Sequence, residues 1–120
     1  MNVITITIGR NRRPGSEIAP FTPLSAGDWL RFRVEILEAL EPLTGPKAWT
    51  ETHYGEAEWE GVKEESAKVT VLGAWTDAAG LATLRNRLRN LAAQYDQDAI
   101  AVSVGTSDLV LSQPRVPVAA

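Results

Sequence analysis

His53 is the chain's one histidine, and it lies in a segment rich in glutamate and aromatic residues, "AWTETHYGEAEWEG", residues 48–61. An imidazole with an ordinary pKa of about 6.5 is the side chain best suited to move a proton at neutral pH. If the segment is a regular strand, Glu51 projects to the same face and its carboxylate can orient the ring. Tyr54 follows directly and adds a hydroxyl group. His53, Glu51 and Tyr54 are therefore the candidate catalytic residues.

The alternative for this segment is a surface strand that binds a partner. No serine or second histidine stands where it would complete a catalytic set with His53. Gly55 favours a bulge, and a bulge reverses the pleat that follows it. Trp49 and Trp59 then need not share a face, and Glu51 need not meet the histidine. We predict a long, bent edge strand fringed with glutamate, with Trp49 and Trp59 as partner-binding residues.

Metal and cofactor chemistry is disfavoured by the residues that are missing. The chain has no cysteine, which excludes disulfides, thiolate metal sites and a cysteine nucleophile. Glu56, Glu58 and Glu60 alternate as strand residues do, whereas a calcium loop needs its ligands in a tight turn with a central glycine. Neither a P-loop nor the glycine pattern of dinucleotide-binding proteins is present. We predict no metal and no cofactor, and favour a protein without enzymatic activity.

Arginine residues gather in two places. Arg10, Arg12 and Arg13 follow the first predicted strand in "GRNRRPG", and guanidinium groups suit phosphate geometry. The segment opens no helix directly, so a solvated loop is the favoured interpretation and phosphate or partner binding is the alternative. Arg85 and Arg89 stand four residues apart on a predicted helix, where like charges repel mildly and typically face solvent.

Hydrophobic periodicity predicts the elements that position these residues. Alternating apolar residues are typical of strands, and apolar residues three and four apart are typical of helices. The predicted strands are residues 2–8, 47–60, 66–72 and 99–104, and the predicted helices are about 25–43 and 77–95. Ser25 and Thr76 are the predicted helix N-caps. We expect a single domain, 1–120, with a flexible loop at about 10–24 and a proline-containing tail at about 112–120.

The order of these elements, strand–helix–strand–strand–helix–strand, predicts the fold. It is the split βαβ pattern of the ferredoxin-like α+β fold, in which each half forms one βαβ unit with a right-handed crossover. We therefore predict a four-stranded antiparallel sheet with two helices on one face. The first and third strands are expected at its centre and the second and fourth at its edges.

The sheet face away from the helices is predicted to carry small and mostly neutral side chains. Besides Lys68, Ala99 and Ser103, it holds the residues that we expect in a dimer contact: Val3, Thr5, Thr7, Thr70, Leu72 and Ala101. An antiparallel sheet tolerates a wet face. The same face also suits packing against a second copy, as in dimeric α+β barrels, which resemble this layout. We predict a homodimer.

Three stretches after the first strand carry a family resemblance. They are "SAGDWLRF" (Ser25, Trp29, Phe32), "EESAKVTVL" (Glu65, Ser66, Val69) and "YDQDAIAV" (Tyr95, Gln97, Ile100). The pattern resembles an uncharacterised family of small bacterial ferredoxin-like α+β domains, with a Ser-x-x-x-Trp-x-x-Phe helix start, a Glu-x-Ser strand and a Phe/Tyr-x-Gln turn. The glutamate-rich second strand departs from that family. Because the family has no assigned function, the resemblance implies the fold and no activity.

Three hypotheses for the function follow. We favour a non-enzymatic binding or protein-interaction domain that self-associates through its sheet. The second hypothesis is a small-molecule enzyme or ligand carrier of the dimeric α+β barrel type that uses His53, Glu51 and Tyr54. The third is a phage or mobile-element accessory protein that acts on a host factor.

Charge and hydropathy limit the partners. The net charge of −3 at pH 7 and the absence of aromatic residues from strands 2–8 and 66–72 argue against nucleic acid. No apolar run reaches the ~20 residues of a membrane span. The N-terminal residues alternate as in a strand and lack the basic start of a signal peptide. We therefore expect a cytoplasmic protein of bacterial or phage source that contacts other proteins, a second copy of itself included.

Overall fold

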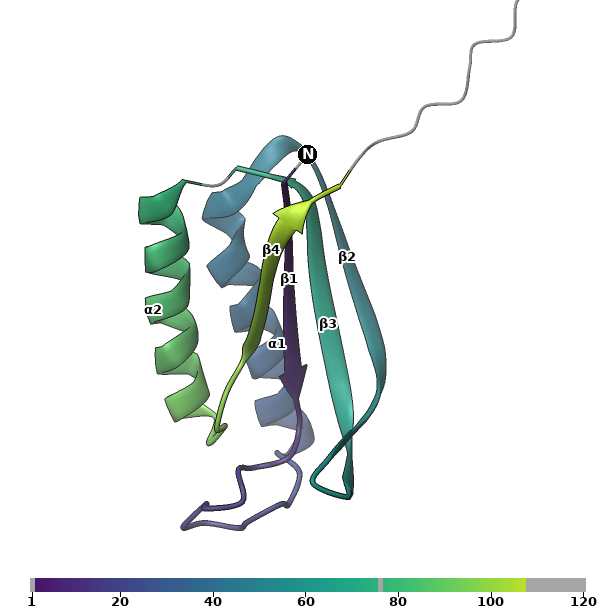
Figure 1. Ribbon diagram of the computed structural model, residues 1–120. Coiled ribbons are helices and arrows are strands. Elements are labelled where there is room, and N and C mark those ends of the chain that lie inside the picture. Colours follow the sequence, from purple (N-terminus) through teal and green to yellow (C-terminus); the bar gives the residue numbers. More distant parts are fainter. Residues whose placement is uncertain (1, 76, 108–120) are drawn as a thin grey trace, which may run out of the picture.

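The computed structural model describes residues 2–75 and 77–107 and shows a sheet with two helices packed on one of its faces (Figure 1). Along the chain come β1 (Asn2–Gly9), α1 (Ala26–Leu40), a 3₁₀ turn (Glu41–Leu43), β2 (Thr44–Trp59), β3 (Val62–Ala74), α2 (Ala78–Gln94) and β4 (Ala101–Thr106). The strands lie in the order β2-β3-β1-β4, and every neighbouring pair is antiparallel. The predicted ferredoxin-like α+β fold is confirmed. The predicted tail at 112–120 lies outside the described residues.

Alternating side chains of the two central strands form one wall of the core. Ile4, Ile6 and Ile8 of β1 are at most 3% exposed. Ile4 pairs with Val71 of β3 and Ile6 with Val69, and directly opposite residues project from the same sheet face. The strand period of two thus buries a row of β-branched residues on the side that the helices cover.

Each helix begins at a side-chain cap. Ser25 Oγ accepts a hydrogen bond from the backbone N–H of Asp28, 3.1 Å away, as expected for the cap of α1. The cap of α2 is Asp77, whose Oδ1 accepts from the N–H of Gly80 over 2.6 Å. The prediction of Thr76 as this cap is wrong, and a carboxylate there also complements the positive end of the helix dipole.

Three aromatic rings join α1 to the C-terminal end of α2. The ring of Phe32 stacks on that of Tyr95 with 4.6 Å between centroids, and Trp29 meets Phe32 edge-on at 6.2 Å. Phe32 is fully buried and Tyr95 is 5% exposed. The Tyr95 hydroxyl donates a hydrogen bond to Glu35 Oε2 over 2.7 Å, which satisfies the polar end of a ring that is otherwise buried.

The Tyr95 phenol makes stability depend on alkaline pH. Burial, followed by the hydrogen bond to Glu35, raises the pKa of Tyr95 from 10.0 to about 12. A raised folded-state pKa contributes stability that is fully present below pH 10 and is lost as the pH rises toward 12. We expect Tyr95→Phe to remove this part of the alkaline decline. Urea unfolding at about pH 8 and about pH 11 measures it, and equal declines in both proteins would contradict the assignment.

The edge strand β2 is regular where a bulge was predicted. Gly55 pairs directly with Ser66, and the register runs without a break from Trp49 to Trp59. The irregularity lies earlier, between Thr44 and Trp49. The predicted bulge at Gly55 is therefore wrong, because ladder pairing on both sides of the glycine holds it extended.

The hairpin that joins β2 to β3 is tighter than predicted. Its turn consists of Glu60 and Gly61, with φ values of 49° and 79°. Two central residues with positive φ are the signature of a type I′ turn, whose twist matches that of the flanking strands. Pairing therefore continues to the tip, and β3 begins at Val62 rather than at residue 66.

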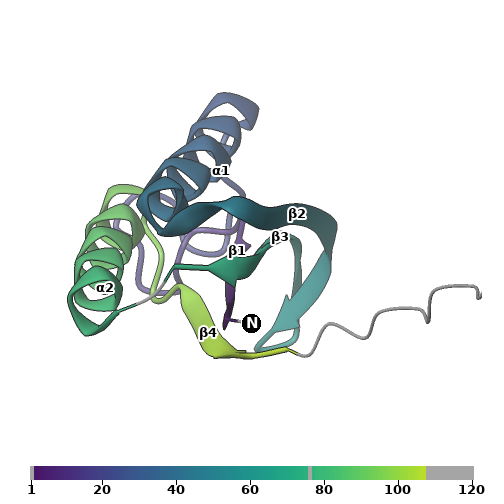
Figure 2. The same cartoon turned by 90° about the horizontal axis from the view of Figure 1, so that it is seen from above.

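The sheet is curled. Seen from above, the half of β2 and β3 nearest the hairpin turn bends round toward β4, so the face without helices is concave (Figure 2). Strand twist is largest in long two-stranded ribbons, and β2 and β3 form such a ribbon beyond the end of β1. The concave shape decides which surfaces are available for binding.

The segment predicted as a flexible loop, residues 10–24, crosses the end of the molecule where β1 leaves the sheet (Figure 1). Its two arms pair with each other. The N–H of Arg12 donates to the carbonyl of Thr22 over 2.8 Å, and the N–H of Leu24 donates to the carbonyl of Arg10 over 2.9 Å. Leu24 is 1% exposed and belongs to the core. Backbone pairing and one buried side chain thus tie down both ends of the loop.

Candidate functional site

The three candidate catalytic residues do not form one site. Glu51 and His53 lie on the uncovered face of β2, with 3.4 Å between His53 Nε2 and Glu51 Oε2. They meet because the strand stays regular through Gly55. Tyr54 projects from the opposite face, as adjacent strand residues do, and its ring lies 5.0 Å from the guanidinium carbon of Arg33 in α1. The grouping of Tyr54 with the histidine is therefore wrong.

The Glu51–His53 pair is open to solvent. The side chains are 44% and 66% exposed, respectively. The side chain of Trp49, and then that of His53, lower the pKa of Glu51 by hydrogen bonding to its carboxylate. A carboxylate held in its charged form is a weak base, and water competes for both groups. The arrangement suits contact with a partner better than proton transfer.

The uncovered sheet face is organised in rows that cross the strands. We name them the apolar row (Trp49, Leu72, Val3), the hydroxyl row (Glu51, Thr70, Thr5, Ser103) and the charged row (His53, Lys68, Thr7, Ala101). The six residues predicted for a dimer contact all lie in these rows. In the hydroxyl row, the Oγ1 atoms of Thr5 and Thr70 are 3.4 Å apart. The side chain of Trp49 is 62% exposed, which is unusual for a large aromatic residue beside other apolar ones.

The concave face encloses a pocket near the hairpin turn, with a volume of about 380 Å³. Ala57 and Val62 line it from the hairpin, Phe21 from the loop, and Ala99 and Ala101 from the side of β4. The pocket exists because the curl of the sheet brings the end of the hairpin over toward β4 (Figure 2). Charged side chains also line it, among them Arg12, Arg13, Glu58, Glu64 and Asp98.

The three loop arginines are paired with carboxylates. Arg10 Nη1 lies 3.1 Å from Glu65 Oε2. Arg13 Nε lies 2.9 Å from Asp96 Oδ1, and Arg12 Nη1 lies 3.5 Å from Asp96 Oδ2. A phosphate would have to displace these partners. The contacts therefore favour a structural role for Arg10, Arg12 and Arg13 over the phosphate alternative.

Asp96 is the anchor that holds the loop to the end of α2. It accepts hydrogen bonds from the hydroxyl of Ser16 and from Nε of Arg13, and it forms an ion pair with Arg12. The next residue, Gln97, donates from Nε2 to the carbonyl of Asn11 over 3.0 Å. The Ser16 hydroxyl, followed by Arg13 and Arg12, holds the pKa of Asp96 below its usual value of 3.8. Sequence analysis missed this anchor, because its partners lie about 80 residues away along the chain.

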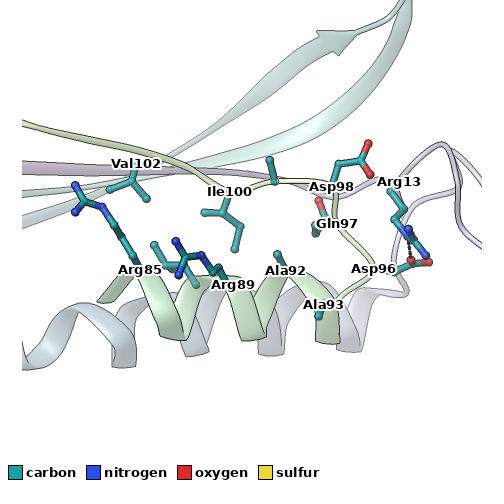
Figure 3. A pocket seen from close by; sticks show the side chains of 12 residues that line it. Arg13, Arg85, Arg89, Ala92, Ala93, Asp96, Gln97, Asp98, Ile100 and Val102 are labelled. Carbon is teal, nitrogen blue, oxygen red and sulfur yellow. Dashed lines mark hydrogen bonds and ion pairs between the residues drawn. The ribbon is translucent and has the colours of Figure 1, made fainter. Parts of the chain in front are cut away.

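A groove runs between α2 and β4, with a volume of about 790 Å³ (Figure 3). Its apolar lining consists of Leu88, Ala92, Ala93, Ala99, Ile100 and Val102. Arg85 and Arg89 project from α2 toward Val102 and Ile100 at one end, and Asp98 stands at the other end (Figure 3). The sequence analysis interpreted Arg85 and Arg89 as a solvated helix face and did not predict this groove. Leu88 and Ala92, each three residues after one of these arginines, were the sequence signal that an apolar surface lies beside them.

The groove arginines differ from the other described arginines in their partners. Those that pair with an aspartate or glutamate are Arg10, Arg12, Arg13, Arg31 and Arg87. The guanidinium of Arg33 lies between the rings of Trp29 and Tyr54. Among residues 2–75 and 77–107, neither Arg85 nor Arg89 forms an ion pair, and Arg89 donates a hydrogen bond to Asn86 Oδ1 over 2.9 Å.

Other binding features follow from the described part of the chain alone. No three histidine, aspartate or glutamate side chains there are grouped as a metal ion requires. None of the helices in that part is long and apolar enough to cross a membrane. Trp59 is the second aromatic residue predicted for partner binding. It is the last residue of β2, and its side chain is not among those that the structure describes.

The chain matches no protein-family model and no curated protein. Similar folds occur among solved structures. A phage SAM lyase in its apo state is 14% identical, over 87% of this chain and 78% of the lyase, with a TM-score of 0.51. The designed protein Foldit4 is 18% identical, over 89% of this chain and 98% of that protein, with a TM-score of 0.49. CutA1 from Pyrococcus horikoshii is 16% identical, over 92% of this chain and 87% of CutA1, with a TM-score of 0.44. The likeness to the lyase agrees with the ferredoxin-like fold and says nothing of activity.

Proposed function

We propose that this chain is a binding protein that self-associates through the uncovered face of its sheet, with a second copy as the occupant of that face. The observation that carries the proposal is the apolar row. Trp49 is 62% exposed beside the half-buried Leu72 and Val3, on the face that lacks helices (Figure 1). Large aromatic residues are enriched at the centres of protein interfaces and depleted on free surfaces.

A second copy fits the apolar row by symmetry. A twofold axis parallel to the strands brings this row of one copy onto the same row of the other. In such an isologous contact the same residues come from both sides, so an apolar patch meets an apolar patch. Trp49, Leu72 and Val3 of each copy then leave water together, which is the main favourable term in association.

The other two rows set the conditions of the contact. Thr5 and Thr70 lie within reach of one another, so their hydroxyl groups need not lose all hydrogen bonding when a second sheet approaches. Lys68 and Glu51 are exposed on the same face and stay hydrated where its concavity keeps the copies apart. Two concave faces touch at their rims, which leaves the pocket of about 380 Å³ enclosed between the copies.

Sedimentation velocity of the unmodified protein at micromolar concentration tests the proposal, with a dimer as the expected result. Leu72→Arg introduces a charge into the middle of the apolar row, between Trp49 and Val3, so we expect that variant to sediment as a monomer. Thr83→Arg is the matched control, because Thr83 is exposed on α2 away from the sheet. It should remain a dimer. A monomeric unmodified protein at about 100 μM would overturn the proposal.

The remaining hypotheses stay predictions. An enzyme or ligand carrier keeps Glu51 and His53 together on the proposed contact face, without Tyr54. His53→Ala separates the two hypotheses. An enzyme that uses His53 should lose its turnover of substrate, whereas a binding protein has no turnover to lose and should still self-associate. The phage-accessory hypothesis and the cytoplasmic location likewise remain predictions.

A further inference from the structure

The groove between α2 and β4 is lined by Arg85 and Arg89, and neither of them forms an ion pair with a carboxylate among the described residues. Arg33 also lacks a carboxylate partner there, but its guanidinium lies against the rings of Trp29 and Tyr54. Arg85 and Arg89 stand one helical turn apart on the wall of the groove. Two positive charges at this spacing repel each other. An anion bound between them is attracted to both guanidinium groups and offsets that repulsion. Guanidinium groups present planar pairs of donors that match carboxylate and phosphate oxygens. Charge and geometry therefore both favour an anion at this end of the groove.

The rest of the groove specifies what the anion must be attached to. Leu88 is 3% exposed, and Ala92, Ile100 and Val102 are half-buried, so the lining below the arginines is apolar. At the opposite end stand Asp98 and the ion pair of Asp96 with Arg13 (Figure 3). The charge there is negative on balance, so it repels a second negative group. The ligand must therefore carry its charge at one end only, with an uncharged body over Ile100 and Val102.

We propose that the groove binds a small organic anion that has one carboxylate or phosphate head and a short apolar body. The head lies between Arg85 and Arg89, and the body lies on Ile100, Val102 and Ala92. The groove is on the helix layer of the molecule and contains none of the apolar, hydroxyl or charged rows. It shares Arg13, Gln97, Asp98 and Ala99 with the pocket of the concave face, but the residues that hold the ligand, Arg85, Arg89, Ile100 and Val102, do not line that pocket. Anion binding and self-association can therefore fail separately.

Titration of the full chain with hexyl phosphate, hexanoate and 1-hexanol tests the inference, followed by ¹H–¹⁵N NMR of the backbone amides. We expect both anions to shift the amides of residues 85–92 and 100–102 with millimolar affinity or better, and hexanol to bind at least roughly tenfold more weakly. The tighter of the two anions identifies the head group. No shift at these amides up to about 10 mM of either anion overturns the inference.

Three variants separate the groove from a general effect of charge. Arg85→Gln and Arg89→Gln should each weaken anion binding roughly tenfold, the loss expected for one charge-assisted hydrogen bond. Arg87→Gln is the matched control, because Arg87 belongs to the same helix and faces Glu38 at 3.7 Å, outside the groove. It should bind as the unmodified protein does. Equal weakening in all three variants would assign the effect to net charge and overturn the site.

Discussion

Replacing Phe32 with alanine is expected to lower the free energy of unfolding by about 3–5 kcal/mol. Phe32 is fully buried, and its ring contacts the faces and edges of Tyr95 and Trp29 at 4.6 and 6.2 Å between centroids. Alanine removes these contacts and leaves a cavity where the two helices meet. Because small domains are stable by only about 5–15 kcal/mol, the change removes a large part of the total.

Urea unfolding at neutral pH, followed by circular dichroism, measures the loss. The matched control is Phe21→Ala, since Phe21 is the chain's other phenylalanine and is 38% exposed in the loop. It should cost less than about 1 kcal/mol. Phe32→Leu retains most of the volume and should fall between the two. A loss for Phe32→Ala no larger than that of the control would refute the assigned role of the ring stack.

The second large effect is expected from Asp96→Asn, which should cost about 2 kcal/mol at pH 7. Asparagine keeps the shape of the side chain and tolerates the positive φ of 56° at this position. It lacks the charge that Arg12 and Arg13 require. Both arginines then lose their carboxylate, and Ser16 loses a charged acceptor. The loop at 10–24 should become the first part of the protein to exchange its amide hydrogens.

The cost of Asp96→Asn should depend on pH. The folded-state pKa of Asp96 is lowered, chiefly by the Ser16 hydroxyl and then by Arg13. A lowered pKa contributes stability that is present above the ordinary value of 3.8 and is lost as the pH falls through the folded-state pKa. The unmodified protein should therefore exceed Asp96→Asn in unfolding free energy by the largest amount at neutral pH. This difference should become smaller as the pH falls below 3.8.

Asp98→Asn provides the control for this pH dependence. Asp98 is exposed two residues further on, and it forms no ion pair among the residues that the structure describes. Its replacement should leave the unfolding free energy nearly unchanged at both neutral and acidic pH. If the Asp96→Asn difference stays constant down to about pH 2, the carboxylate is not the anchor that its contacts indicate.

The fold was predictable from the chain because its signals are local. Alternation in residues 2–8 and the leucine stripe of α2 follow from the geometry of a strand and a helix, whatever surrounds them. The same alternation correctly assigned the residues of the uncovered face. The positions that carry the family resemblance have structural roles: Ser25 caps α1, and Trp29, Phe32 and Tyr95 form the ring stack. The family itself stays a prediction.

The errors in strand β2 arose where a local preference competed with pairing. Glycine weakens a strand in isolation, so Gly55 favoured a bulge. Its partner Ser66 lies eleven residues away, across a two-residue turn, and the ladder on both sides keeps the strand extended. The error for Tyr54 has a different origin. Tyr54 was grouped with His53, although adjacent residues of a strand point to opposite faces of the sheet.

The binding features depend on contacts between residues that are distant in the chain. Asp96 becomes an anchor only when the loop at 10–24 returns to the end of α2. Arg85 and Arg89 line a groove only because α2 packs beside the segment that leads into β4, which sets Leu88 against Ile100 and Val102. Periodicity reports which face of an element is apolar, but it does not report which element lies opposite. That choice belongs to long-range packing, and it determines where this chain can bind a ligand.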